Sequence, residues 1–103
     1  MTEYVTDIEQ LEYKGTPIVV CFTNPYTCNP CRVFKPHFEN AAKTITEAEF
    51  VEVDATDPES APIVQEYLTK FLTPTVILIT EDGRTEIESR TTLPLIAEIN
   101  DLI

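Results

Sequence analysis

Two short apolar runs rich in β-branched residues most constrain the fold of this chain. Residues 18–22 (IVVCF) and 75–80 (TVILIT) are too short to stand as helices and are bounded by turn-forming residues. Residues 50–55 (FVEVDA) alternate and are rich in valine, which is typical of a strand. We therefore expect three strands, with residues 18–22 and 75–80 buried and residues 18–22 central in the sheet.

Helical patterns fill the intervals between these runs. One helix opens at Cys28 and contains Pro36, which should kink it. A second helix starts within residues 56–62 (TDPESAP), and a closing helix has Thr92 as its expected cap. We expect three buried apolar faces, in chain order: Phe34, Phe38, Ala41 and Ile45; Ile63, Val64, Tyr67, Leu68 and Phe71; Leu95, Ile96, Ile99, Leu102 and Ile103.

Shorter elements complete the pattern. A Thr-x-x-Glu capping box at residues 6–9 predicts a short first helix that ends at Gly15, after a strand near residues 4–5. An Asp-Gly pair at residues 82–83 predicts a hairpin turn, with residues 85–89 as the return strand.

The order of these elements predicts an α/β fold in a single domain over residues 1–103. Alternating strands and helices imply parallel strands with helices on both faces, and the hairpin adds antiparallel strands. We expect a central mixed sheet of four to five strands. Active groups in such a sheet lie beyond the carboxyl end of a strand, where residues 18–22 lead into two cysteines.

The charge and hydropathy of the chain exclude several classes of partner. Seven Lys plus Arg against eighteen Asp plus Glu give a net charge of −11, which repels nucleic acid and anionic membrane surfaces. No apolar run approaches the roughly 20 residues that span a bilayer. The acidic start of the chain lacks the pattern of a secretory signal, so we expect a soluble, cytoplasmic monomer.

Cys28 and Cys31 form a C-x-x-C motif at the start of the predicted helix. A thiol in the first helical turn meets unpaired N–H groups and the positive end of the helix dipole, which favour the thiolate. We therefore predict Cys28 as the attacking nucleophile and Cys31 as the more buried resolving thiol, with Arg32 as a nearby positive charge. Asn29 and Pro30 add no titratable group, which favours a reducing or balanced redox couple.

A zinc site is the main alternative for this cysteine pair. Zinc commonly takes four ligands, and beyond the pair the chain offers only Cys21 and His37. Cys21 lies in the middle of a strand and fits a small core residue, while His37 lies too far along the helix to share a ligand sphere. We therefore predict redox chemistry with no metal and no cofactor.

Several motifs have the spacing of one known family. They are the C-x-x-C pair after a buried strand, Pro36 five residues beyond Cys31, Asp54 at the end of the next strand with Ala-Pro at residues 61–62, and Thr-Pro-Thr at residues 73–75. With these features the sequence resembles the thioredoxin family over nearly its whole length. The resemblance implies a thioredoxin fold and a cis proline at Pro74 that faces the cysteines.

The resemblance also implies a substrate-binding edge. In thioredoxins the backbone before the cis proline pairs with the substrate chain as an added strand, which assigns that part to Thr73 and Pro74. By the same resemblance, Asn29 and Pro30 line the exposed sulfur of Cys28.

The chain departs from the family pattern near the motif. Thr27 replaces the usual Trp, and neither the buried Asp nor the nearby Lys of the family is present; the nearest positions are Cys21 or Phe22, and Phe50. Alternation along residues 50–55 places Glu52 on the opposite face of the sheet. Leu72, and Ser89 or Arg90, replace glycines of the substrate surface, and the helix before Thr73 reads about one turn longer than in the family.

The expected function is that of a cytosolic thiol-disulfide oxidoreductase that reduces protein disulfides. Its partners would be disulfide-containing proteins and a thioredoxin reductase or equivalent electron donor. Two alternatives stay open: a dedicated, glutaredoxin-like electron donor to a single enzyme such as ribonucleotide reductase, and a non-catalytic binding module built on the same fold.

Overall fold

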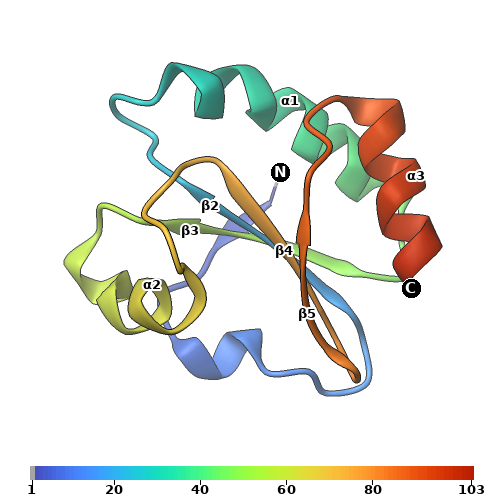
Figure 1. Cartoon of the computed structure of the whole chain (residues 1–103), viewed down its shortest axis with the longest axis horizontal. Helices are drawn as coiled ribbons and strands as arrows, with labels where there is room; N and C mark the ends of the chain where they lie inside the picture. Colours follow the sequence, from blue (N-terminus) through green and yellow to red (C-terminus); the bar gives the residue numbers. More distant parts are fainter. Residues whose placement is uncertain (1) are drawn as a thin grey trace.

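A computed structural model describes residues 2–103. The centre of the fold is a five-stranded sheet with the strand order β1-β3-β2-β4-β5 (Figure 1). The strands are β1 (Glu3–Tyr4), β2 (Ile18–Thr23), β3 (Glu49–Asp54), β4 (Thr75–Thr80) and β5 (Gly83–Ile87). β3 pairs in parallel with both β1 and β2, whereas β4 is antiparallel to β2 and β5. The mixed sheet and the expected strands are confirmed, but the return strand β5 lies two residues earlier than predicted, at Gly83–Ile87 and not at residues 85–89.

Helices cover both faces of the sheet (Figure 1). They are the 3-10 helices η1 (Ile8–Leu11) and η2 (Pro58–Ser60) and the α-helices α1 (Asn29–Thr44), α2 (Ala61–Tyr67) and α3 (Thr92–Leu102). α1 and α3 pack on one face, and η1 and α2 pack on the other. None of these helices combines the length and apolar character needed to cross a membrane, for the chain from residue 2 onward.

All six residues of β2 are buried because both faces of this central strand are covered. Val19 and Cys21 face the cluster under α1 and α3, which also holds Phe38. Val20 and Phe22 face the cluster under η1 and α2. Full burial of a large side chain such as Phe22 contributes about 2–3 kcal/mol. The sheet is thereby fixed between two cores, and the carboxyl end of β2 leads into the cysteine motif.

The first helix begins one residue later than its predicted capping box. The Asp7 side chain, rather than Thr6, accepts from the Glu9 N–H at 3.0 Å, and Gln10 Oε1 accepts from the Asp7 N–H at 3.3 Å. Asp is as good an N-cap as Ser and better than Thr, so the neighbouring residue takes the position. The element is a 3-10 helix that ends at Leu11 and not at Gly15.

The predicted apolar face of the second helix extends too far. α2 ends at Tyr67, because Leu68 has the extended backbone that starts the approach to Pro74. Phe71 is consequently 65% exposed, although its spacing predicts burial. The expected additional helical turn before Thr73 is therefore wrong.

The start and end of α3 also differ from the prediction. Its N-cap is Thr91, which makes no side-chain capping bond, and Thr92 is the first helical residue. His37 of α1 supplies the missing acceptor: its Nδ1 accepts from the Thr92 backbone N–H at 3.1 Å and bonds the Thr92 hydroxyl at 2.7 Å. At the other end, Leu102 and Ile103 are exposed, although their helical spacing predicts burial.

Candidate active site

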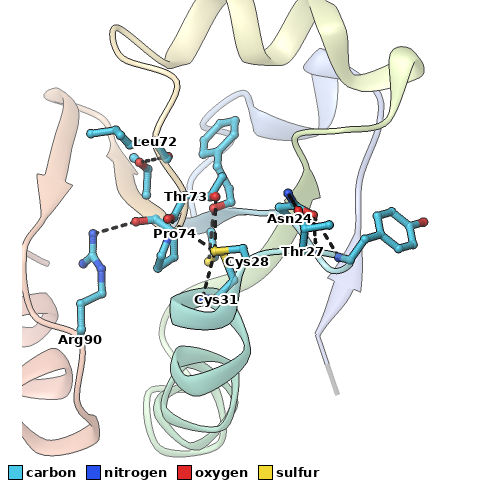
Figure 2. Close-up of a disulfide and its surroundings, with 12 residues drawn as sticks. Asn24, Thr27, Cys28, Cys31, Leu72, Thr73, Pro74 and Arg90 are labelled. Atoms are coloured by element: carbon cyan, nitrogen blue, oxygen red, sulfur yellow. Dashed lines mark hydrogen bonds between the residues drawn. A yellow bond between two sulfur atoms is a disulfide. The ribbon is translucent and has the colours of Figure 1, made fainter.

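The loop between β2 and α1 is folded around Asn24. Its Oδ1 accepts from the backbone N–H groups of Tyr26 and Thr27, at 3.0 and 3.1 Å, and its Nδ2 donates to the Thr27 hydroxyl at 2.8 Å (Figure 2). Such local bonds are the reason that Asn favours turns. They fix the four residues, 24–27, that connect the end of β2 to Cys28. The sequence pattern did not single out Asn24, although the Asn-Pro dipeptide is a turn signal.

Cys28 and Cys31 are joined by a disulfide, with their Cα atoms 5.3 Å apart. Cys28 is the N-cap of α1, and its sulfur accepts from the Cys31 backbone N–H at 3.2 Å. Cys28 is partly exposed, whereas Cys31 is only 4% exposed. The structure therefore places the first sulfur within reach of another molecule and the second behind it.

The Thr73–Pro74 peptide bond is cis, as the resemblance implies. Thr73 lies against the disulfide: its hydroxyl donates to the Cys28 sulfur at 3.5 Å, and its carbonyl oxygen lies 3.6 Å from the same sulfur (Figure 2). Asn29 and Pro30 open α1 and are exposed. All six residues predicted for the site thus gather at one end of the sheet, beyond the carboxyl end of β2.

Arg90 holds the cis-proline segment in place. Its guanidinium donates to the carbonyl oxygens of Ile87 (2.6 Å), Ser89 (3.0 Å) and Pro74 (3.3 Å). The guanidinium carbon also lies 5.4 Å from the centre of the Phe34 ring, a cation–π contact. In the sequence, Arg90 stands out only as one of two residues that could replace a glycine, because these contacts to carbonyl groups leave no sequence pattern.

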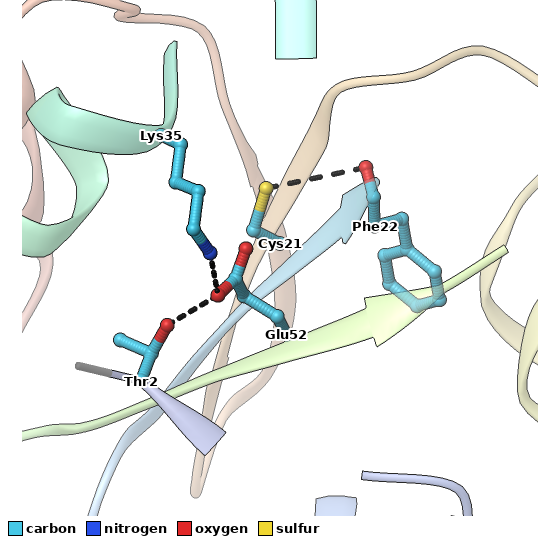
Figure 3. A network of polar contacts seen from close by, with 5 residues as sticks. All are labelled: Thr2, Cys21, Phe22, Lys35 and Glu52. Carbon is cyan, nitrogen blue, oxygen red and sulfur yellow. Dashed lines mark hydrogen bonds and ion pairs between the residues drawn. The ribbon is translucent and has the colours of Figure 1, made fainter. Parts of the chain in front are cut away.

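Glu52 lies on the α1 side of the sheet, which corrects its predicted placement. It pairs with Cys21 in the register of β2 and β3, and Cys21 faces the core under α1. Glu52 is 2% exposed; it receives a hydrogen bond from Lys35 Nζ at 2.8 Å and another from the Thr2 hydroxyl (Figure 3). The alternation of Val51, Glu52 and Val53 predicted that only the face with the two valines is buried. In the structure both faces of β3 are buried, so alternation does not show which helix covers Glu52.

The buried Glu52 carboxylate helps to raise the pKa values of two neighbours, Lys35 and Cys21. Burial works to lower the pKa of Lys35, but the hydrogen bond and the negative charge of Glu52 outweigh it and raise that pKa. Burial raises the pKa of the Cys21 thiol strongly, and the Glu52 charge raises it further. Cys21 is therefore held as a neutral thiol.

The residues weighed for a metal site are used elsewhere. Cys21 is in the core, and His37 accepts a hydrogen bond from the first turn of α3. Within residues 2–103, no three His, Cys, Asp or Glu side chains are grouped so that they could hold a metal ion.

Comparison with known proteins agrees with this geometry. A sequence model of the Thioredoxin family matches residues 2–100. A search of curated protein sequences finds no match. Among solved structures, a thioredoxin from Fasciola hepatica is 29% identical, with 98% of each chain covered and a TM-score of 0.75.

Two further solved structures share the fold at lower identity. Mitochondrial thioredoxin 3 from Saccharomyces cerevisiae, in its oxidized form, is 21% identical, with 97% of this chain and 94% of that chain covered and a TM-score of 0.80. The Trx4 domain of ERdj5 is 24% identical, with 98% of this chain and 94% of that chain covered and a TM-score of 0.81.

Proposed function

We propose that this chain, which belongs to the thioredoxin family, reduces disulfide bonds in other proteins. In its reduced form, the Cys28 thiolate attacks one sulfur of a client disulfide and releases the other as a thiol, which leaves a mixed disulfide. The Cys31 thiolate then attacks the Cys28 sulfur and releases the client as a dithiol. The client gains two electrons and two protons, and Cys28–Cys31 becomes the disulfide.

The unequal exposure of the two sulfurs is the observation that carries this proposal. Cys28 is accessible at the start of a helix, while Cys31 is buried directly behind it. The Cys31 N–H and the Thr73 hydroxyl both donate to the Cys28 sulfur, and donors of this kind favour a thiolate. If both thiols were buried, or both equally exposed, their positions would not assign attack on the client to one cysteine and release of the client to the other.

The client would dock as an extended segment beside Thr73 and Pro74. These residues lie just before β4 and outside its hydrogen-bonded ladder, which begins at Thr75. A strand added at this point would pass over the Cys28 sulfur, which lies next to the Thr73 carbonyl group. Asn29 and Pro30 would flank that strand on the helix side.

A thioredoxin reductase, or an equivalent donor, would return electrons to the oxidised pair. We further propose that the protein acts in the cytoplasm as a monomer. The net charge of −11 supports a protein that stays dissolved and binds neither nucleic acid nor anionic membranes.

Reduction of insulin disulfides, with a generic thioredoxin reductase as donor, tests the proposal. We expect turnover by the natural protein and none by Cys28→Ser. Cys31→Ser should accumulate mixed disulfides with its clients, and mass spectrometry of these adducts would identify them. Turnover that survives the loss of both cysteines would refute the proposal and favour a binding module.

The trapped adducts also separate a general reductant from a dedicated electron donor. Adducts with many proteins would support the general role. Adducts with one enzyme, together with rapid reduction of the oxidised pair by glutathione, would support the glutaredoxin-like alternative instead.

A further inference from the structure

A pocket of about 330 Å³ lies beside the disulfide and is not used by the proposed reaction. Its wall includes Tyr4, Pro25, Tyr26, Asp54, Asp57 and Ser60. Tyr4 and Pro25 also line the neighbouring pocket, of about 240 Å³, that contains Cys28 and Cys31. The two pockets therefore share a wall, and a chain bound at the sulfur can place a nearby side chain in the second pocket.

The carboxylates of this pocket have no cationic partner. Asp54 Oδ1 accepts from the backbone and hydroxyl groups of Thr56, and Asp57 Oδ1 accepts from the Glu59 N–H. Each carboxylate thus uses only one of its two oxygens, in hydrogen bonds to residues that follow it closely in the chain. Neither takes part in an ion pair anywhere in residues 2–103. The pocket therefore presents uncompensated negative charge.

Ser60 gives an independent indication that the pocket takes a hydrogen-bonding group. The Ser60 side chain is fully buried, and its hydroxyl oxygen has no hydrogen-bond partner within residues 2–103. A buried hydroxyl without a partner costs free energy that a bound donor recovers. Among the described residues, no other buried side-chain oxygen or nitrogen lacks a partner.

Aromatic side chains complete the wall. Tyr26 is 71% exposed and Tyr4 is 45% exposed, so both rings are open to a visiting group. Lys35 Nζ lies 5.4 Å from the centre of the Tyr4 ring, which shows that this ring accepts a cation. Lys35 does not neutralise the pocket, because its charge is paired with Glu52 and it lines the sulfur pocket instead.

From this combination we infer that the pocket binds an arginine side chain of the client, a few residues from the disulfide cysteine. The inference rests on the proposed reduction of protein disulfides. A guanidinium supplies five N–H donors, which suit two carboxylates and a hydroxyl, and its plane stacks on a tyrosine ring. The overall charge of −11 attracts basic segments toward this surface. The pocket thus selects clients that are basic next to their disulfide.

Chromogenic peptide disulfides test the inference. Each peptide carries one cysteine in a mixed disulfide with an aromatic thiol, and arginine is placed in turn at each of several positions on either side of that cysteine. The comparison peptides carry citrulline, a neutral isostere, at the same position. At one or more positions we expect KM to be roughly fivefold lower for arginine at low salt.

Three variants then locate the preference. Asp54→Asn and Asp57→Asn keep the oxygen that forms each local cap but remove the charge, and both should reduce the ratio of KM values toward one. Asp82→Asn is the matched control, because it removes one charge at the distant hairpin and retains a good turn sequence; it should keep the ratio. The absence of any arginine preference, or its full persistence in Asp54→Asn/Asp57→Asn, would overturn the inference.

A binding experiment separates this inference from the proposed function. A peptide with arginine at the preferred position, or at each scanned position in turn, and serine in place of cysteine is titrated into the natural protein and followed by NMR. Shifts at Tyr26 and Ser60 that the citrulline peptide does not cause would support the pocket even if no peptide disulfide were reduced. If all peptides were reduced but no such NMR shift changes occurred, the proposed disulfide reduction would be supported and the proposed arginine-binding pocket would be refuted.

Discussion

The Thr73 hydroxyl donates a hydrogen bond to the Cys28 sulfur across 3.5 Å, although 45 positions separate the two residues in the chain (Figure 2). The Cys31 N–H donates to the same sulfur from the helix side at 3.2 Å. The loop before β4 and the first turn of α1 therefore converge on one atom. Two donors at this sulfur stabilise a negative charge on it once the pair is reduced.

Thr73→Val should slow the reaction of reduced Cys28 with iodoacetamide at neutral pH. Valine has the shape of threonine without the hydroxyl, so the thiolate loses one donor; we expect a decrease of roughly two- to fivefold. The rate is measured in a Cys31→Ser background, so that only Cys28 reacts. Thr73→Ser keeps the hydroxyl and should retain the rate. Equal rates for the valine and serine variants would show that the hydroxyl does not act on the sulfur.

The ion pair between Lys35 and the buried Glu52 should contribute to stability. Lys35→Met leaves Glu52 buried without its cation, and we expect the free energy of unfolding to fall by about 2 kcal/mol. This value is below that of a fully buried pair because 38% of the Lys35 side chain is exposed. Urea unfolding measures the change, and Lys35→Met/Glu52→Met should restore most of it.

The exposed pair between Arg84 and Glu66 is the matched control. Both side chains are about half exposed, so Glu66→Gln should cost at most about 0.5 kcal/mol.

The raised pKa of Lys35 also predicts a pH dependence of stability. The contribution of the Lys35–Glu52 pair to the free energy of unfolding is fully present below the ordinary Lys pKa of 10.5, and it is lost as the pH rises through the higher pKa of the folded protein. A Lys35→Met difference that did not shrink as the pH was raised above 10.5 would contradict this account.

The fold was predictable because short-range patterns agree with it. Strand β2 lies between turn residues, and the apolar spacing of Phe34, Phe38 and Ala41 matches the buried face of α1. The errors fall at element ends, where a single cap decides the boundary. Asp7 replaces Thr6 in this way, and the turn after Tyr67 exposes Phe71.

The site was predictable only where its residues lie close in sequence or in a familiar motif. Cys28 and Cys31 are neighbours, and Thr73 and Pro74 come from the resemblance. Contacts between distant segments leave no such pattern. The bond from Arg90 to the Pro74 carbonyl group depends on tertiary structure alone. The position of Glu52 depends on which helix covers its face, because both faces of β3 are buried and alternation then carries no signal.

Cys21 should be unreactive while the protein is folded. Burial and the Glu52 charge raise the pKa of its thiol, and reagents cannot reach it without local opening. With Cys28–Cys31 oxidised, we expect Cys21 to react with maleimide at least about a hundredfold more slowly than in denaturant. Mass spectrometry counts the labels: none in the native protein and one after unfolding. Rapid labelling of the native protein would place Cys21 outside the core.

Glu98 should stabilise the junction of β5 and α3 except in acid. Burial works to raise its pKa, but hydrogen bonds from Ser89 and from the Glu88 N–H outweigh it and hold that pKa below the ordinary value of 4.5. A lowered pKa means that the charged carboxylate stabilises the fold above pH 4.5 and that this contribution is lost as the pH falls through the value of the folded protein.

Glu98→Gln keeps an acceptor oxygen and removes only the charge. At neutral pH we expect it to lower the free energy of unfolding by up to about 1 kcal/mol, because Glu98 is largely solvated. The difference from the natural protein should shrink as urea unfolding is repeated at lower pH, below 4.5. Glu81→Gln removes the same charge at the exposed hairpin and corrects for the change in net charge. A difference that grew in acid would mean that Glu98 is stabilised in its protonated form, contrary to the hydrogen bonds that it accepts.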